Sequence, residues 1–238
     1  MSLHWIKKKH TFHFIKTRMK ADIARQELSL GFPSLIAQVS SGIITITFNT
    51  IILHLEGNTG VAAYGVVANI SLIIVAIYTG IAQGVQPLIS RFYAIENKKQ
   101  LHRVWRYAVV TTLTLSCIIY CSIFAFAQPI TAVFNHENNV KLQQLAVTGL
   151  QLYFISNPFV GYNIILATYF TSTEKALPAQ ILSILRGLVL IIPMAFILSI
   201  TWKMPGVWLS YPITEILTAL FGFVIYKHYK IKQRKETE

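Results

Sequence analysis

The stretch LSLGFPSLIAQVSSGIITITFNTIILHL, residues 28–55, is a run of 28 residues without Asp, Glu, Lys or Arg. Three further charge-free runs follow, with 34 residues at 57–90, 30 at 107–136 and 32 at 142–173. Each run is longer than the roughly 20 residues with which a helix crosses the hydrocarbon core of a bilayer. Because the runs are continuously apolar and do not alternate with polar residues, they predict membrane-spanning helices and not the strands of a barrel.

Two more apolar stretches each contain one charged residue. Residues 178–200 include Arg186, and residues 205–226 include Glu215. Together the six stretches predict an all-α, polytopic membrane protein with six transmembrane helices. We expect three parts: a basic, amphipathic cytoplasmic linker at 1–28, a six-helix lobe at 29–227 and a cytoplasmic tail at 228–238.

The composition also excludes an ordinary soluble domain. Of the 238 residues, 54% are hydrophobic and 13% are charged, whereas about a quarter of the residues of soluble domains are charged. The formal net charge is +12, and 19 of the 21 Lys and Arg lie on one side of the predicted membrane, with Lys141 and Lys203 on the other. By the positive-inside rule we expect both termini in the cytoplasm and a multi-pass chain in a bacterial-type cytoplasmic (inner) membrane. The positive charge therefore indicates topology and not nucleic-acid binding.

The linker allows two interpretations. Phe12, Ile15, Met19 and Ile23 recur at helical spacing among basic residues. This pattern is typical of an amphipathic helix lying on the inner leaflet of the bilayer. A solvated basic linker explains the same residues equally well.

Amide and aromatic side chains occur within the first, second and fourth stretches. A helix that faces only lipid has no use for them, so one face of each helix is expected to look into the bundle or into a wet cavity. For the aromatic side chains, packing between helices is the alternative; in a cavity they would suit a flat or cationic organic ligand. The candidate substrate-cavity residues are Gln38, Asn49, Asn69, Tyr78, Gln83, Gln86, Asn157, Tyr162, Asn163 and Tyr169.

Proline and glycine residues predict where these helices start, bend and approach one another. Pro33 is expected at the first turn of the first helix. Pro87 can bend the second helix, and Pro158 removes one hydrogen bond from the fourth. Gly80 and Gly84 form a Gly-x-x-x-Gly face against which another helix can pack closely.

The two charges inside the predicted membrane are the strongest functional signal. Glu215 lies about midway along its span, where an ionised carboxylate costs at least about 2.5 kcal/mol. Arg186 differs from it in depth by about four residues, roughly 6 Å at helical rise. Two hypotheses therefore stay open: a structural ion pair with Arg186, or a Glu215 that titrates as the cation-coupling group of a transport cycle.

No enzyme signature is present. The sequence lacks Gly-x-Ser-x-Gly, His-Glu-x-x-His and the nucleotide-binding Gly-x-x-x-x-Gly-Lys-Ser/Thr. Cys117 and Cys121 lie one helical turn apart without further ligands at metal-binding spacing, so we expect small packing residues there. We predict neither an enzyme nor a metal centre nor an organic cofactor.

With these residues identified, the sequence resembles the C-terminal lobe of a MATE (multidrug and toxic compound extrusion) transporter. The resemblance extends over residues 30–226 in the order of the family, and its most specific segment is GIAQGVQP at 80–87. The matching segments are LGFPS at 30–34, VAAYG at 61–65, GIAQGVQPLIS at 80–90, NP at 157–158, SILR at 183–186 and GVWLSYP at 206–212.

The resemblance implies one lobe of a twelve-helix transporter. Such proteins have two six-helix lobes and expel organic cations in exchange for H+ or Na+ by alternating access around a central cavity. The expected partners are thus the lipid bilayer, small organic cations, and either an N-terminal lobe or a second copy of the chain. The implied coupling ion is H+ or Na+, and Glu215 is the only deep acidic residue that could bind it.

Two further functions remain as alternatives to the half-transporter. One is a non-transporting membrane remnant or interaction module. The other is a flippase for lipid-linked sugars, which related transporters resemble; it would require a strongly cationic cavity, to which only Arg186 could contribute.

Overall fold

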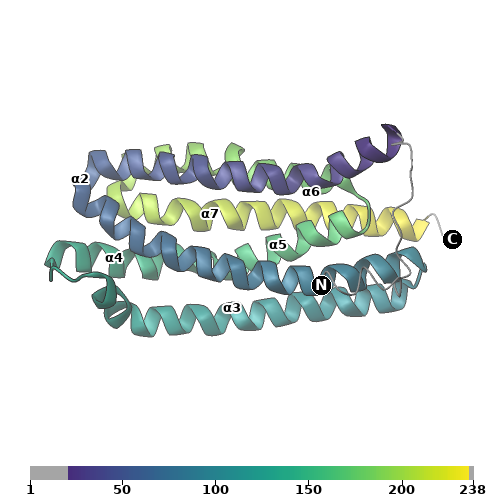
Figure 1. Ribbon diagram of the computed structural model, residues 1–238, viewed down its shortest axis with the longest axis horizontal. Helices are drawn as coiled ribbons and strands as arrows, with labels where there is room; N and C mark the ends of the chain where they lie inside the picture. Colours follow the sequence, from purple (N-terminus) through teal and green to yellow (C-terminus); the bar gives the residue numbers. More distant parts are fainter. Residues whose placement is uncertain (1–20, 236–238) are drawn as a thin grey trace, which may run out of the picture.

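The computed structural model describes residues 21–235 and consists of long helices that lie side by side (Figure 1). Most of the predicted linker, including Phe12, Ile15 and Met19, lies outside the described residues, as do the last three residues of the predicted tail. Within the described part no strand is present. This agrees with the all-α fold expected from the continuous apolar runs.

The first element, α2 (Ala21–Ala94), is folded back on itself at Gly57. Gly57 has φ 65° and ψ −157°, a conformation that glycine adopts without the steric cost that a Cβ would bring. Nearby, a Cβ on Gly60 would lie 2.5 Å from the Cβ of Glu56, so this turn depends on glycine at two positions. The reversal separates the first two apolar stretches of the sequence.

Two asparagines start the next helices. Asn97 precedes α3 (Lys98–Phe134), and its side chain accepts a hydrogen bond from the backbone N–H of Gln100. Asn139 precedes α4 (Val140–Tyr153) and accepts from the N–H of Leu142 in the same way. Asparagine is favoured at this position because its side chain satisfies a backbone donor that the helix leaves unpaired.

The fourth apolar stretch is broken in the middle. A short 3₁₀ helix, η1 (Phe154–Ser156), separates α4 from α5 (Asn157–Ser172). Pro158 stands in the first turn of α5, where its missing N–H costs no internal hydrogen bond. The hydrogen bond that Pro158 was expected to remove from a continuous helix is thus not lost, because a new helix begins at this position.

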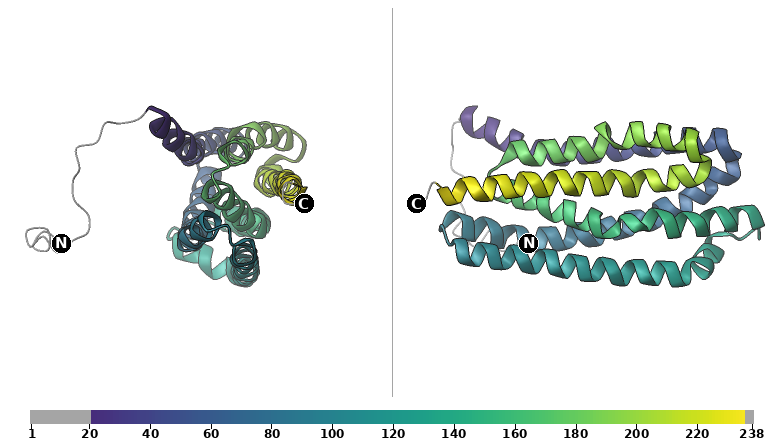
Figure 2. Two further views of the ribbon diagram at one scale, coloured as in Figure 1. Left: turned by 90° about the vertical axis from the view of Figure 1, so that its right-hand side faces the viewer. Right: turned by 180° about the vertical axis from the view of Figure 1, so that it is seen from behind.

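The last third of the chain forms α6 (Ala176–Ile184), a π-helical turn η2 (Leu185–Val189) and α7 (Ile191–Lys235). The helix α7 reverses at Lys203, which has φ 52°. Seen from behind, the chain runs through α6 and η2 into the first part of α7 and then returns beside it (Figure 2). The reversals of α2 and α7 lie at the same end of the bundle.

Within residues 21–235, three helical segments are long and apolar enough to cross a membrane: Gln38–Ala94, Lys98–Phe134 and Ala176–Tyr229. Two of them contain the reversals at Gly57 and Lys203. The chain is thus a multi-pass membrane protein by length and composition. The count of six crossings and the cytoplasmic side of the termini stay predictions.

Aromatic and branched side chains fill the centre of the bundle. Trp208 of α7 is fully buried and packs near Tyr64 of α2, which in turn stacks on Phe48 with ring centroids 5.5 Å apart. Large hydrophobic side chains also cover the outside, as is expected where the solvent is lipid. The core connects both halves of α2 with α7, so the bundle is one packed unit.

One local expectation about proline was wrong, and one about glycine stays a prediction. Pro33 does not start a helix, because α2 already begins at Ala21. A Cβ on Gly80 or Gly84 would meet nothing within 4 Å, so no helix among the described residues packs closely there. Close contact of this face with a helix of a second lobe stays a prediction.

Candidate functional site

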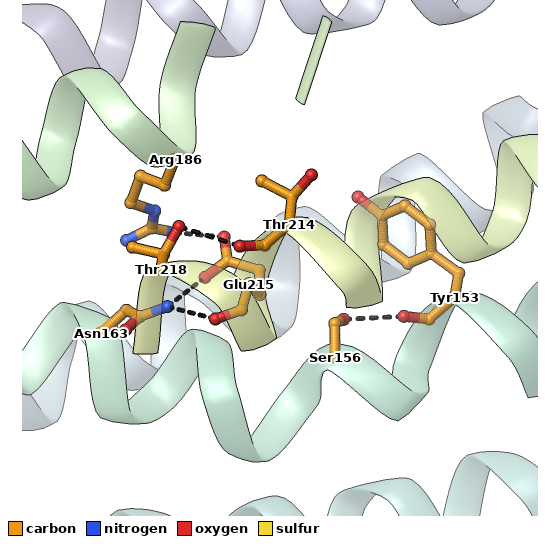
Figure 3. Close-up of polar contacts among 7 residues, drawn as sticks. All are labelled: Tyr153, Ser156, Asn163, Arg186, Thr214, Glu215 and Thr218. Atoms are coloured by element: carbon orange, nitrogen blue, oxygen red, sulfur yellow. Dashed lines mark hydrogen bonds and ion pairs between the residues drawn. The ribbon is translucent and has the colours of Figure 1, made fainter. Parts of the chain in front are cut away.

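The carboxylate of Glu215 is the centre of a buried polar network (Figure 3). The residue is 1% exposed. Its Oε1 lies 3.1 Å from Nη2 of Arg186, and its Oε2 accepts a hydrogen bond of 2.7 Å from the Nδ2 of Asn163. The same amide nitrogen also donates to the backbone carbonyl of Glu215 at 3.0 Å. Both carboxylate oxygens thus have a donor, as a buried ionised group requires.

Three separate elements bring these side chains together. Glu215 belongs to the second part of α7, and Asn163 to α5, about two turns after the restart at Pro158. Arg186 belongs to the π turn η2, in which the N–H of Leu190 donates to the carbonyl of Leu185 at 3.0 Å. A π turn inserts an extra residue and rotates the side chains that follow, and such turns are frequent at functional sites.

A pair of stacked tyrosines borders the network. Tyr211 lies one helical turn before Glu215 and close to both Arg186 and Glu215. The ring of Tyr211 stacks on that of Tyr153 in α4, with centroids 4.5 Å apart and an angle of 2° between the planes. The network therefore reaches α4 as well as α5, η2 and α7.

A second polar cluster lies where α5 restarts. Tyr78 of α2, Thr112 and Ser116 of α3, and Asn157 of α5 are all buried. Ser116 donates to the carbonyl of Thr112 at 2.7 Å and reaches that of Asn157 at 3.4 Å. The close approach depends on Gly161, since a Cβ there would lie 2.5 Å from Cγ2 of Thr112.

Four aromatic rings gather between α3, α5 and α7. Trp105 stacks on Tyr226 at 5.3 Å and lies 4.8 Å from Tyr169 and 6.4 Å from Tyr162, measured between ring centroids. These rings contact one another, so Tyr162 and Tyr169 take part in the packing between these helices. Whether they also face a ligand stays a prediction.

The ten candidate cavity residues fall into three groups. Tyr78, Asn157, Asn163 and Tyr169 are buried inside the bundle, and Asn49 and Tyr162 are partly buried. The four residues on exposed positions of α2 are Gln38, Asn69, Gln83 and Gln86. The structure therefore does not bring the ten together, and their role in a cavity stays a prediction.

Many polar side chains of α2 form hydrogen bonds with backbone carbonyls of their own helix. Thr45, Thr47 and Thr50 each donate to the backbone carbonyl four residues earlier, at 2.8–2.9 Å. Asn69 does the same with the carbonyl of Gly65 at 2.8 Å. Such bonds let a polar side chain remain in an apolar helix without a partner on another helix. The count of polar residues in a span is thus a weaker sign of a cavity than we expected.

The structure adds residues that the sequence did not single out. Tyr211 stands four residues before Glu215, a spacing that places both on the same helix face, so this signal was available. Trp105, Thr112 and Ser116 come from α3, whose sequence gives no indication of which face meets α5. Among the described residues there is no group of three His, Cys, Asp or Glu that could bind a metal ion.

Comparison with known proteins gives consistent matches. The family model described as MatE matches residues 33–197. The multidrug export protein MepA of Staphylococcus saprophyticus is 23% identical over 208 residues, which are 87% of this chain and 45% of that protein. MepA of a bovine Staphylococcus aureus strain is 24% identical over 82% of this chain and 42% of its own length. The chain therefore spans less than half the length of these curated relatives.

A solved structure supports the same fold. An outward-facing multidrug resistance MATE family transporter of the MOP superfamily superposes with a TM-score of 0.86 at 20% sequence identity, covering 98% of this chain and 53% of that one. At this identity the likeness concerns the fold alone. Since the family model matches more than half of the sequence and the solved structure matches nearly all of the fold, the chain belongs to the MatE family.

Proposed function

We propose that this chain is one lobe, equivalent to the C-terminal lobe, of a secondary-active multidrug efflux antiporter. It would expel small organic cations in exchange for H+ or Na+ by alternating access with a second lobe. The second lobe is supplied by the same polypeptide, another polypeptide or a second copy of this chain. The relatives are named as multidrug export proteins, and the family is one of transporters and not of enzymes.

The observation that carries the proposal is the exposed face of the second half of α2. Asn69, Gly80, Gln83 and Gly84 recur at helical spacing and are exposed, and the apolar Leu72 and Ile73 are exposed beside Asn69. A helix that faces lipid presents large apolar side chains, whereas small and amide side chains favour contact with another helix or with water. This face is therefore suited to line the space between two lobes.

The flippase alternative finds less support. It requires a cationic cavity, and the only cation inside the predicted membrane, Arg186, is paired with Glu215 at 3.1 Å. A non-transporting module and a transporter lobe would have the same helical bundle. The two functions are therefore distinguished by experiment and not by the fold.

The test measures ethidium accumulation in efflux-deficient bacterial cells. The chain would be expressed alone and together with the N-terminal half of a MepA relative, and its amount in the membrane would be measured by immunoblot. We expect reduced accumulation when the second lobe is present. The matched test variant is Gln83→Leu, which removes an amide from the exposed face and should lower efflux without changing the amount of protein in the membrane; Thr50→Val, whose hydroxyl bonds to its own helix, is the control.

Accumulation that stays unchanged in both cases, with the protein present in the membrane, would contradict the transporter proposal and favour the interaction module. Efflux by the chain expressed alone would instead indicate a homodimer. In that case chemical cross-linking between cysteines introduced at positions 80 and 84 should yield the dimer.

A further inference from the structure

The pairing of Glu215 resembles the surroundings of a carboxylate that has bound a cation. A buried ionised carboxylate is stable only if a positive charge and hydrogen-bond donors surround it. At Glu215 the donors are the Asn163 amide at 2.7 Å and the Arg186 guanidinium at 3.1 Å. The positive charge is thus part of the chain and does not come from solution.

The π turn that carries Arg186 packs closely against α2. The next residue, Gly187, is so close to Ser40 that a Cβ on the glycine would lie 2.6 Å from the Ser40 Cβ. Any side chain at 187 would push η2 away from α2. The close contact fixes the backbone of the π turn that bears Arg186, so the guanidinium starts from a fixed position next to Glu215.

Every element packed around Glu215 adds to this arrangement. Tyr211 on the same helix face lies close to both charges. Tyr153 of α4 stacks on Tyr211. Polar groups near the carboxylate also include Asn163 from α5, Arg186 from η2, and Thr214 and Thr218 from α7 (Figure 3). Arg186 is the only one among them that carries a positive charge.

We propose that Arg186 takes the place of an exchangeable cation at Glu215, so that this carboxylate binds no coupling cation from solution. The guanidinium cannot be deprotonated in proteins, and a covalently attached cation cannot be exchanged. If the lobe works in an antiporter, its coupling cation binds elsewhere. The proposal goes beyond the efflux function, because its test measures cation binding and holds whether or not drugs are moved.

The first measurement uses the unmodified chain of 238 residues, purified in detergent. Its melting temperature would be followed by intrinsic fluorescence while NaCl replaces choline chloride at constant ionic strength. We expect no saturable effect of Na+. The protonation state of the carboxyl would be followed by infrared difference spectra between pH 5 and pH 8, with Glu215→Gln as the reference. A saturable stabilisation by Na+, or a carboxylic acid band that is absent from Glu215→Gln, would overturn the proposal.

The second measurement removes the attached cation. Arg186→Gln leaves Glu215 buried without a countercharge, and we expect the melting temperature in choline chloride to fall by about 5 °C or more. Na+ or a pH near 5 should restore most of this loss, because either neutralises the carboxylate. The double variant Arg186→Gln with Glu215→Gln should be more stable than Arg186→Gln in choline chloride and insensitive to Na+.

The matched control is Arg186→Lys, which keeps the positive charge and should remain insensitive to Na+. An Arg186→Gln variant as stable as the unmodified chain, or one whose loss neither Na+ nor acid relieves, would refute the proposal. If Arg186→Gln does not fold, the unmodified chain and Arg186→Lys still decide the question: saturable Na+ binding to either one contradicts it, and its absence from both supports it.

Discussion

Asn163 and Gln83 are both neutral amides in apolar helices, yet their surroundings are opposite. Asn163 is 1% exposed and donates two hydrogen bonds to Glu215, whereas Gln83 lies on an exposed position of α2. A buried amide that connects two helices stabilises the lobe itself. An amide on an outer face adds little to the lobe and is available to a ligand or a second lobe. The two regions should therefore respond differently to substitution.

The same contrast holds for the glycines. Gly161 lets α3 approach α5 so closely that a Cβ would lie 2.5 Å from Thr112, while Gly84 has nothing within 4 Å of a Cβ. Close packing is thus already used inside the lobe at Gly161 and is unused at Gly84. Substitutions in the interior should therefore destabilise the lobe more than substitutions on the outer face.

The largest effect is expected for Glu215→Ala. The change removes the buried partner of Arg186, whose own side chain is 21% exposed, and breaking a buried ion pair costs up to about 3–5 kcal/mol. Gln83→Ala, on the exposed face, should change stability by less than about 0.5 kcal/mol. Unfolding of the detergent-purified chain with temperature measures both. Equal losses in the two variants would show that the interior and the outer face do not differ in the way we infer.

A smaller loss is expected for Gly161→Val. The added side chain must displace Thr112 and Ser116, and such overpacking costs about 1–3 kcal/mol. The matched control, Gly84→Val, should leave the stability of the chain unchanged, because no atom is near the new side chain. The same thermal unfolding assay compares them. If Gly84→Val destabilised the purified chain, the inference that the space around Gly84 is open would be wrong.

Gln83→Leu addresses transport instead of stability. If Gln83 contacts a polar ligand between two lobes, the lost hydrogen bond of about 1 kcal/mol should reduce efflux about fivefold. The melting temperature should stay the same. Ethidium efflux in cells that also express the second lobe gives the measurement, with Thr50→Val, which alters a hydroxyl bonded to its own helix, as the control. Equal efflux by Gln83→Leu and by the unmodified chain would show that Gln83 does not contact the transported ligand.

The smallest effect is expected at the end of the bundle where α2 reverses. Lys141 and Glu56 form an ion pair of 2.8 Å, with the Lys141 side chain 59% exposed. Exposed pairs contribute less than about 1 kcal/mol, and salt screens them. Lys141→Ala should therefore lower stability slightly at low salt and have no effect at high salt. A larger or salt-independent loss would mean that this pair acts as a buried one.

The positions of the helices were largely predictable. Charge-free runs mark the apolar segments, and the two reversals, at Gly57 and Lys203, fall between stretches that the sequence separates. The start of the first helix was not predictable from Pro33, because the helix extends back through residues with good helix propensity to Ala21. The π turn at 185–189 has no sequence signal of its own.

The candidate site was predictable only in part. The ion pair between Arg186 and Glu215 was one of two hypotheses that followed from depth alone, and the contact of 3.1 Å is present in the structure. Asn163 was identified as polar but assigned to a cavity, while it reaches Glu215 instead. Tyr211 was not identified, although its spacing of four residues from Glu215 offered a signal.

The sequence by itself determined that this chain lies in a membrane, since an apolar run without charge is unstable in water over that length and its backbone must form a helix in lipid. It also determined which residues are costly enough in a membrane to matter, above all Glu215 and Arg186. Only the tertiary structure decided which way each helix faces. In a helix that is apolar on all sides, the hydrophobic pattern does not define an inner face, so the contacts between helices select the buried polar residues.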